Sequence, residues 1–372
     1  MTDKYVEVTT RSWGSRILDS FVGMFIGLVL ILVAFIVLWV NEGRVDMSKV
    51  AARSVPVSAS TVDPSTNGKL VAATGILDSA EQLGDPGYLK PGRYIQISRD
   101  VEMYAWIEHT KSETKKNVGG SETTTTEYTY EKGWTGYPAD SSDFKIPDAH
   151  ENPAMPLEAQ TYTVQSAKVG AYTVDPQRIS LPGGSKLQLN AGNVVSGTGS
   201  LQGSYLFIGK GSEQAPRVGD VRVSYLALPA GIEVTAFGQA DGDRLVPYLY
   251  QGKHTLYSAY AGDRASAIES MAFEYTMIGW LLRIGGFLMM WFGLYLLLGP
   301  ISTFLDVLPF LGNLSRGATW LVTLGVAFIL SLATIIVSAI FHNLVLMLLL
   351  LVIVVAVAVR RSRQAAPRRA AA

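Results

Sequence analysis

Few residues in this sequence combine the types and spacing that catalysis needs. Cysteine is absent, which excludes disulfides, thiol catalysis and every cysteine-containing metal site. The four histidines are scattered, and only His150, beside Asp148 and Glu151 in "DAHENP", has neighbours that could make it an acid, a base or a metal ligand. A histidine beside an Asn-Pro turn is more often structural, and neither a nucleophile elbow nor a zinc-protease motif occurs. We therefore predict no catalytic residues, no metal site and no cofactor.

Arg283 is a charged residue inside an otherwise apolar segment. A cation at the centre of a membrane span costs about 2.5 to 3.5 kcal/mol, so it needs a partner or access to water. Glu42 follows the first apolar run, in "WVNEGRVD", and is expected near the same membrane boundary. We hypothesise an ion pair between Glu42 and Arg283 at this boundary, with Gly43 providing a turn into the next domain. The alternatives are that Arg283 extends alone to the headgroups and that the polar cluster only ends the helix.

Five glycines in the apolar segments have spacings typical of close helix packing. Gly23 and Gly27 form a G-x-x-x-G pair in the first segment. Three others share one face of a helix: Gly279, Gly286 and Gly293. We predict that all five lie in packing seams, and the first pair gives weak support for self-association of the chain.

Residues 300–317 are too apolar for an ordinary exposed loop, so we expect a short amphipathic or re-entrant element at the membrane interface. Asp306 interrupts the apolar run. Its carboxylate could bind a cation or receive a proton from a lipid, and the more ordinary interpretations are a helix cap or a contact with Arg316. Together with His150, Asp306 is a candidate functional polar residue.

Four apolar segments are expected to cross a membrane as helices. Residues 21–40 are consecutive apolar residues, and at about 1.5 Å per residue they match a hydrocarbon core about 30 Å thick. The other three lie near the C-terminus, at residues 277–298, 320–341 and 344–359. Only His342 and Asn343 separate the last two, which favours a tight helical hairpin.

Basic residues predict the orientation of these spans. Lysine and arginine are concentrated in residues 1–20 and 360–372, and Arg316 lies in the connection at residues 299–319. We expect these three segments, and therefore both termini, on the cytoplasmic side. The long segment at residues 41–276 is then an extracytoplasmic domain.

The segment at residues 41–276 is expected to be rich in β-structure. Val101, Met103, Ala105 and Ile107 alternate with other residues at the period of a strand, and a Gly-Gly turn followed by aromatic and β-branched residues predicts a hairpin at residues 101–134. Further strands are expected within residues 69–77, 219–228 and 232–239, and a short helix within residues 265–275. The predicted fold class is an α+β membrane protein with four transmembrane helices and a large inserted β-rich domain.

Five short motifs follow one another along the chain: "NEGR" at 41–44, "YTYEKGW" at 128–134, "HENP" at 150–153, "DRLVPY" at 243–248 and "WLLRIGG" at 280–286. With the predicted topology, they resemble the LUMA (transmembrane protein 43) family over nearly the whole chain. The resemblance implies an animal endomembrane protein tied to nuclear-envelope organisation through lamins and emerin, with bacterial relatives of unassigned role. The β-rich domain has no N-glycosylation acceptor and the tail is rich in arginine and alanine. We therefore expect a bacterial member in an inner membrane, or in the endoplasmic reticulum or inner nuclear membrane if eukaryotic.

The expected function is that of a LUMA-type membrane scaffold, which self-associates and binds partners through the β-rich domain. Expected partners are membrane lipids, further copies of the chain and unknown proteins, whereas a balance of 31 basic and 31 acidic residues gives no reason to expect nucleic acid. One alternative is a lipid-binding or lipid-modifying enzyme, with Arg283 on a phosphate and Asp306 or His150 transferring protons. A second is an oligomeric transporter or channel, lined by a small polar stripe within residues 320–341.

Overall fold

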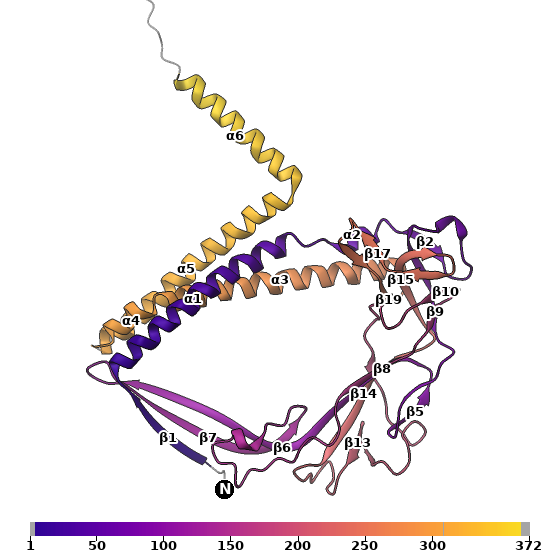
Figure 1. Cartoon of the computed structure of the whole chain (residues 1–372), viewed down its shortest axis with the longest axis horizontal. Coiled ribbons are helices and arrows are strands. Elements are labelled where there is room, and N and C mark those ends of the chain that lie inside the picture. Colours follow the sequence, from indigo (N-terminus) through magenta and orange to yellow (C-terminus); the bar gives the residue numbers. More distant parts are fainter. Residues whose placement is uncertain (1–3, 308, 366–372) are drawn as a thin grey trace, which may run out of the picture. The chain divides into compact units, whose positions relative to one another are not determined.

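The computed structural model describes residues 4–307 and 309–365 and divides the chain into two compact units. The first unit, which we call the β-unit, contains the chain up to Glu7, Asp46–Glu113 and Thr125–Tyr275. The second, the helical unit, contains Val8–Val45, Thr114–Thr124 and the chain from Thr276 onward. Strands dominate the first and helices the second (Figure 1), which confirms the predicted α+β class and β-rich domain.

One sheet of the β-unit closes on itself. Strand β15 pairs with β3 and β16, and β16 is linked back to β3 through β10 and β9, so these five strands form a small barrel. Strands β2 and β19 extend it by pairing with β3 and β15. Small and branched apolar side chains such as Ala73, Val169 and Val234 fill its core. The seven strands are β2 (Val55–Ser58), β3 (Leu70–Asp78), β9 (Ala167–Val169), β10 (Tyr172–Val174), β15 (Ile232–Asp241), β16 (Arg244–Val246) and β19 (Ser258–Ala261).

The second sheet is open and has the strand order β1-β7-β6-β14-β13-β12, with β8 beside β6 and β11 beside β14. In β6, Val101, Met103 and Ala105 are buried as the alternation predicts, and Ile107 is half-buried. Strands β6 and β7 form the expected hairpin, whose tip contains Gly119 and Gly120 at positive φ of 88° and 82°. The strands are β1 (Lys4–Arg11), β6 (Tyr94–Lys116), β7 (Glu122–Thr135), β8 (Gln160–Thr163), β11 (Ser185–Lys186), β12 (Ser200–Gln202), β13 (Tyr205–Ile208) and β14 (Val221–Pro229).

Shorter elements complete the β-unit. Two small ribbons pair β4 with β5 and β17 with β18. The elements are α2 (Met47–Ala51), the 3₁₀ turns η1 (Pro64–Thr66) and η2 (Ser141–Asp143), and the strands β4 (Leu83–Asp85), β5 (Leu89–Gly92), β17 (Tyr248–Tyr250) and β18 (His254–Leu256).

Three helices, α1 (Trp13–Glu42), α3 (Arg264–Leu297) and α5 (Pro309–His342), contain the segments that are long and apolar enough to cross a membrane within the described chain. Helix α1 packs along α3 and also contacts α4 (Gly299–Leu305) and α5 (Figure 1). Their outward side chains are large and apolar, and Phe25, Phe292 and Phe328 are each more than half exposed. Such surfaces are stable in lipid, and the chain is an integral membrane protein by this criterion.

Regular structure extends beyond several of the predicted spans. Helix α1 begins at Trp13, capped by Ser12, and β1 precedes it, so the tail predicted at residues 1–20 is largely structured. The short helix predicted at residues 265–275 is the first part of α3, because no glycine or proline interrupts those residues. Helix α6 (Leu344–Ala365) covers the fourth predicted span, and Asn343 caps its first turn through bonds to two backbone amides. Its crossing of a membrane remains a proposal.

Candidate functional site

Glu42 and Arg283 are in contact at one end of the helical unit. The Nε and Nη2 atoms of Arg283 donate to the two carboxylate oxygens of Glu42 at 2.8 and 2.9 Å. The guanidinium also lies over the ring of Trp280, 5.2 Å from its centroid. Beside this pair, the Asn41 amide donates to the carbonyl of Gly279 at 3.3 Å. The last turn of α1 is thus joined to α3 by a bidentate ion pair, a geometry that is both strong and specific.

Exchanging the two charges tests this pair. We expect Glu42→Arg and Arg283→Glu each to destabilise the full chain in nanodiscs by about 1 to 3 kcal/mol, because each leaves like charges side by side where Glu42 is only 9% exposed. The double exchange should recover most of the loss in thermal unfolding. If the double variant is as unstable as the sum of the singles, the contact does not stabilise the helix pair.

Gly43 ends α1, but not for the reason predicted from sequence. Its φ of −86° is accessible to any residue, so no special turn is needed. A β-carbon at Gly43 would instead lie 2.6 Å from Nε2 of His342. A larger residue here would have to displace the imidazole of His342 from the end of α1.

The five predicted glycines all lie along the contact between α1 and α3. Added β-carbons would meet backbone at two of them: at Gly27 one would lie 2.5 Å from the carbonyl oxygen of Gly293, and at Gly293 one would lie 2.8 Å from that of Gly27. At Gly286 an added β-carbon would lie 2.6 Å from the side chain of Leu38. Gly23 and Gly279 have room for a methyl group, because the nearest atoms to an added β-carbon are 3.8 and 3.9 Å away. In this structure the seam joins two helices of one chain.

Two glycines of α3 offer a matched test of the seam. We expect Gly293→Ala to destabilise the full chain by about 1 to 3 kcal/mol, because a methyl group must displace backbone. Gly285→Ala, which meets open space on the same helix, should be neutral or slightly stabilising. Equal unfolding temperatures of the two variants in nanodiscs would show that α1 and α3 can move apart at Gly293 without loss of stability.

A cluster of ions lies at the other end of α1. The carboxylate of Asp306 is fully buried and accepts hydrogen bonds from Arg16, Arg316 and Lys116, the last at 2.9 Å. Arg16 also pairs through Nε with Glu122 at 2.8 Å. Burial would raise the pKa of Asp306, but the hydrogen bonds from Lys116 and Arg16 and the charge of Arg316 outweigh it and hold that pKa below its ordinary value. We call these five residues the Asp306 cluster.

The tip of the β6–β7 hairpin is docked on this cluster. The carbonyl of Gly120 accepts a hydrogen bond from Arg16, and the amide of Gly119 donates to the carbonyl of Val307 at 3.2 Å. The Trp13 side chain lies against Gly120, where a β-carbon would come within 2.4 Å of the indole. These contacts conflict with the expectation that a bilayer separates all of residues 41–276 from the connection at 299–319. Residues 114–124 and that connection share one side, because backbone groups in contact cannot have a hydrocarbon core between them.

The absence of cysteine allows a direct test of this shared side. Val118 and Val307 are 85% and 40% exposed. We expect single cysteines at these two positions to react with a membrane-impermeant maleimide from the same side of sealed vesicles. Labelling from opposite sides would mean that the tip does not dock on the connection in a membrane.

The structure places His150 in a structural position in the β-unit. Its side chain is 1% exposed, its ring stacks on Tyr130 at 3.7 Å and meets the edge of Trp106 at 4.6 Å, and Nδ1 hydrogen-bonds the carbonyl of Ile146 at 2.9 Å. It lies far from solvent, and no group of three metal-ligating side chains occurs among the described residues. The ring therefore fixes the loop after η2 against the β6–β7 hairpin.

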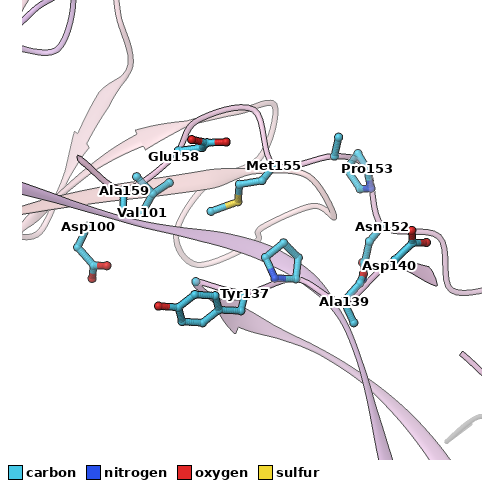
Figure 2. Close-up of a pocket in the computed structure, with 13 residues that line it drawn as sticks. Asp100, Val101, Tyr137, Ala139, Asp140, Asn152, Pro153, Met155, Glu158 and Ala159 are labelled. Carbon is cyan, nitrogen blue, oxygen red and sulfur yellow. The ribbon is translucent and has the colours of Figure 1, made fainter. Parts of the chain in front are cut away.

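A groove in the β-unit has the character of a binding surface. Its cavity of about 710 Å³ is lined by Val101, Tyr137, Met155 and neighbouring prolines and alanines. Three exposed carboxylates surround it, and Figure 2 shows Asp100 and Glu158 on one side and Asp140 on the other. Hydrogen bonds from Ser142 lower the pKa of Asp140, which keeps it charged at neutral pH. We call this the acidic groove.

Sequence reasoning did not find the roles of Arg16, Lys116 and Glu122 in the helical unit, nor the buried pair of Asp85 and Arg99 in the β-unit. Asp306 with Arg316 was foreseen as one of several alternatives. The signal that could have pointed to Arg16 is its position only five residues before an uncharged run of twenty residues, where a cation and a carboxylate tend to be paired.

Comparison with known proteins agrees with this architecture. The family model for transmembrane protein 43 matches residues 103–344. Similar proteins are all named transmembrane protein 43 or its homolog: the rat protein is 29% identical (88% of this chain, 86% of the relative), the human protein 28% (91% and 90%) and the Drosophila melanogaster protein 24% (86% and 89%). These relatives are animal proteins and give no support to the expected bacterial source. No solved structure matches the chain. The family model matches most of the length, and the structure has the membrane helices and the β-rich unit predicted from the sequence, so the chain belongs to the transmembrane protein 43 family.

Proposed function

We propose that this chain is a membrane-organising scaffold that self-associates and binds partner proteins through its β-unit. The observation that carries the proposal is the acidic groove, a concave surface with an apolar floor and three carboxylates at its rim. Concave apolar surfaces with a few polar groups are where proteins usually bind partners and ligands. The Glu42–Arg283 pair and the Asp306 cluster, in contrast, hold structural elements together.

The chemistry of the groove defines the partner segment that it would accept. Asp100, Asp140 and Glu158 favour a lysine or arginine, and Met155 and Tyr137 offer apolar contact to a neighbouring side chain. Tyr137 is 95% exposed and would lose most of that exposure on binding, as aromatic anchors of interfaces do. The expected ligand is thus a peptide segment that combines a basic and an apolar residue.

Peptide selection on the full chain in nanodiscs tests this assignment. Displayed dodecapeptides enriched by the native chain should carry a basic residue next to an apolar one, and Asp100→Lys with Glu158→Lys should abolish the enrichment. Asp241→Lys with Glu233→Lys, which makes the same charge change at exposed positions outside the groove, is the matched control. Enrichment that is unchanged by the groove variant, or lost equally in the control, would refute the groove as the partner site.

The self-association in this proposal needs a surface other than the seam at Gly27. That glycine already packs on Gly293 of the same chain, so the expected role of Gly23 and Gly27 in joining two chains would require the helices to separate. The large exposed apolar surfaces of α1 and α5 leave room for contacts between copies within a membrane. Native mass spectrometry of the gently extracted full chain should show a discrete multimer, and a monomer at every concentration would contradict this part.

The two alternative functions have less support. Arg283 pairs with Glu42, and Asp306 pairs with Arg16. Glu42 and Arg16 lie 26 positions apart in α1, which corresponds to roughly 39 Å along the helix. Arg283 and Asp306 therefore cannot share the active site of a lipid enzyme. The polar stripe of α5 that could line a channel is buried: Ser338 donates to the carbonyl of Trp39 at 2.9 Å, and Thr323 and Ser331 are 2% and 3% exposed. These contacts favour packing over conduction.

The membrane and the orientation belong to the same proposal. We place both termini in the cytoplasm on the strength of the basic flanks, with α6 as the fourth crossing. The three animal relatives favour the endoplasmic reticulum or inner nuclear membrane over a bacterial inner membrane. Single cysteines in β1 and near the end of α6 should react with an impermeant maleimide from the same side of sealed vesicles, because four crossings return the chain to the side on which it starts.

A further inference from the structure

A small pocket opens beside the Asp306 cluster in the helical unit. It has a volume of about 290 Å³, and three arginines, Arg11, Arg16 and Arg316, line it together with the acids Asp19 and Glu122. Its remaining wall comes from the ends of α1, α3 and α4 and includes Gly23, Tyr295 and Leu296. The pocket therefore joins a basic surface to the apolar helices.

The charges around the pocket do not balance. Asp306 and Glu122 are the anions of the cluster, and Arg16, Lys116 and Arg316 are its cations, so one positive charge is in excess. Arg11 and Asp19 form a separate neutral pair at 3.1 Å. The excess charge is poorly hydrated, because the side chains of Arg16 and Lys116 are only 7% and 11% exposed. An uncompensated charge in such surroundings is costly, and one bound monovalent anion would remove the cost.

The depth of the pocket points to the source of that anion. Arg16 lies five residues before the apolar run that starts at Phe21, a distance of about 7.5 Å along the helix. Arg316 lies four residues before Trp320, where the apolar part of α5 begins, and Leu296 lies at the end of the apolar part of α3. All three helices thus pass from apolar to polar at the pocket, which is where lipid headgroups lie.

We propose that this pocket binds the phosphodiester of an anionic phospholipid. Arg316 is the principal contact, because its side chain is 32% exposed and contacts Asp306 through one nitrogen, Nη2. A guanidinium has five N–H donors in a planar fork that fits a phosphate group. Arg11, with a side chain that is 60% exposed, lies on the same pocket and adds a second guanidinium. The acyl chains then lie along the exposed apolar side chains of α1, such as Val22 and Phe25. The site is independent of the acidic groove.

Lipid retention by the purified full chain tests the proposal. The chain is titrated with phosphatidylglycerol, with phosphatidylcholine and with inorganic phosphate, and bound species are counted by native mass spectrometry. We expect one phosphatidylglycerol per chain, bound at least tenfold more tightly than phosphatidylcholine. Retention of phosphate with no preference for phosphatidylglycerol would overturn the lipid assignment and indicate a free-anion site.

Two variants change the charge excess in opposite directions. Arg316→Gln balances the cluster, so it should weaken phosphatidylglycerol binding at least tenfold while leaving the lipid-free chain as stable as the native one or more so. Glu122→Gln increases the excess and should tighten binding. Arg93→Gln, at an exposed arginine of the β-unit, is the matched control and should bind like the native chain. Unchanged binding in Arg316→Gln, or weaker binding in both cluster variants, would overturn the site.

Discussion

Replacing Asp306 by alanine should cost the full chain about 3 to 5 kcal/mol of stability, the largest loss expected for a single change in the helical unit. The carboxylate is fully buried and is the shared partner of Arg16, Lys116 and Arg316. Its removal leaves three neighbouring cations that repel one another, with only Glu122 to offset them. The hairpin tip, which reaches the cluster through Lys116, should be released first.

Hydrogen exchange on the full chain in nanodiscs localises this effect. In Asp306→Ala, protection should fall at residues 114–124 and 299–307 before it falls elsewhere, and the unfolding temperature should drop. Asp19→Ala is the matched control, because its pair with Arg11 has both side chains at least half exposed, and exposed pairs contribute about 0 to 1 kcal/mol. If the two variants lose stability equally, Asp306 is not the centre of the cluster.

The same residue predicts a dependence on pH. Folding lowers the pKa of Asp306, so the unfolded chain binds the proton more readily. The stabilisation by this carboxylate is therefore complete above the ordinary aspartate pKa of about 3.9 and is lost as pH falls through the folded pKa. The stability difference between the native chain and Asp306→Asn should be constant near neutral pH and should shrink below about pH 4. A difference that grows on acidification would reverse the sign and exclude this account.

The parts of the fold that follow local rules could be predicted from the sequence. Alternation located β6 through Val101, Met103 and Ala105, and long apolar runs located α1, α3 and α5. The contact between Glu42 and Arg283 could be anticipated because Glu42 directly follows the first apolar run and Arg283 lies near the start of the second, so both were expected near the same membrane boundary.

Contacts set by the length of the hairpin could not be predicted. Lys116 and Asp306 are 190 positions apart, and their meeting depends on how far β6 and β7 extend beyond the core of the second sheet. Before the fold is known, Lys116 belongs to a charged, threonine-rich stretch that resembles an ordinary solvated strand. Closure of the small barrel is equally hidden, because β9, β10 and β16 have three residues each and carry almost no periodic signal.

Asp85 should be as critical to the β-unit as Asp306 is to the helical unit. It is 1% exposed and accepts hydrogen bonds from Nη1 of Arg99 at 2.9 and 2.7 Å and from the hydroxyl of Tyr225 at 2.6 Å. Burial and the bond to Asp85 raise the pKa of Tyr225, so the phenol remains a neutral donor over the working pH range. Asp85→Ala should cost about 3 to 5 kcal/mol, because the 7% exposed Arg99 would lose its counter-charge without gaining water.

A paired replacement separates the value of the ion pair from the cost of breaking it. Asp85→Leu with Arg99→Met removes both charges together, and it should recover most of the loss seen in Asp85→Ala, because apolar pairs of similar volume often replace buried ion pairs without penalty. Asp78→Ala, at the exposed pair with Arg93, is the control and should change the unfolding temperature little. Arg99 also contacts the carbonyl of Glu158, the side chain of Gln160 and the ring of Tyr88, and failure of the double replacement to recover stability would mean that these partners make the arginine itself indispensable. Because Glu158 also lies on the acidic groove, that outcome would tie the stability of the second sheet to the shape of the proposed partner site.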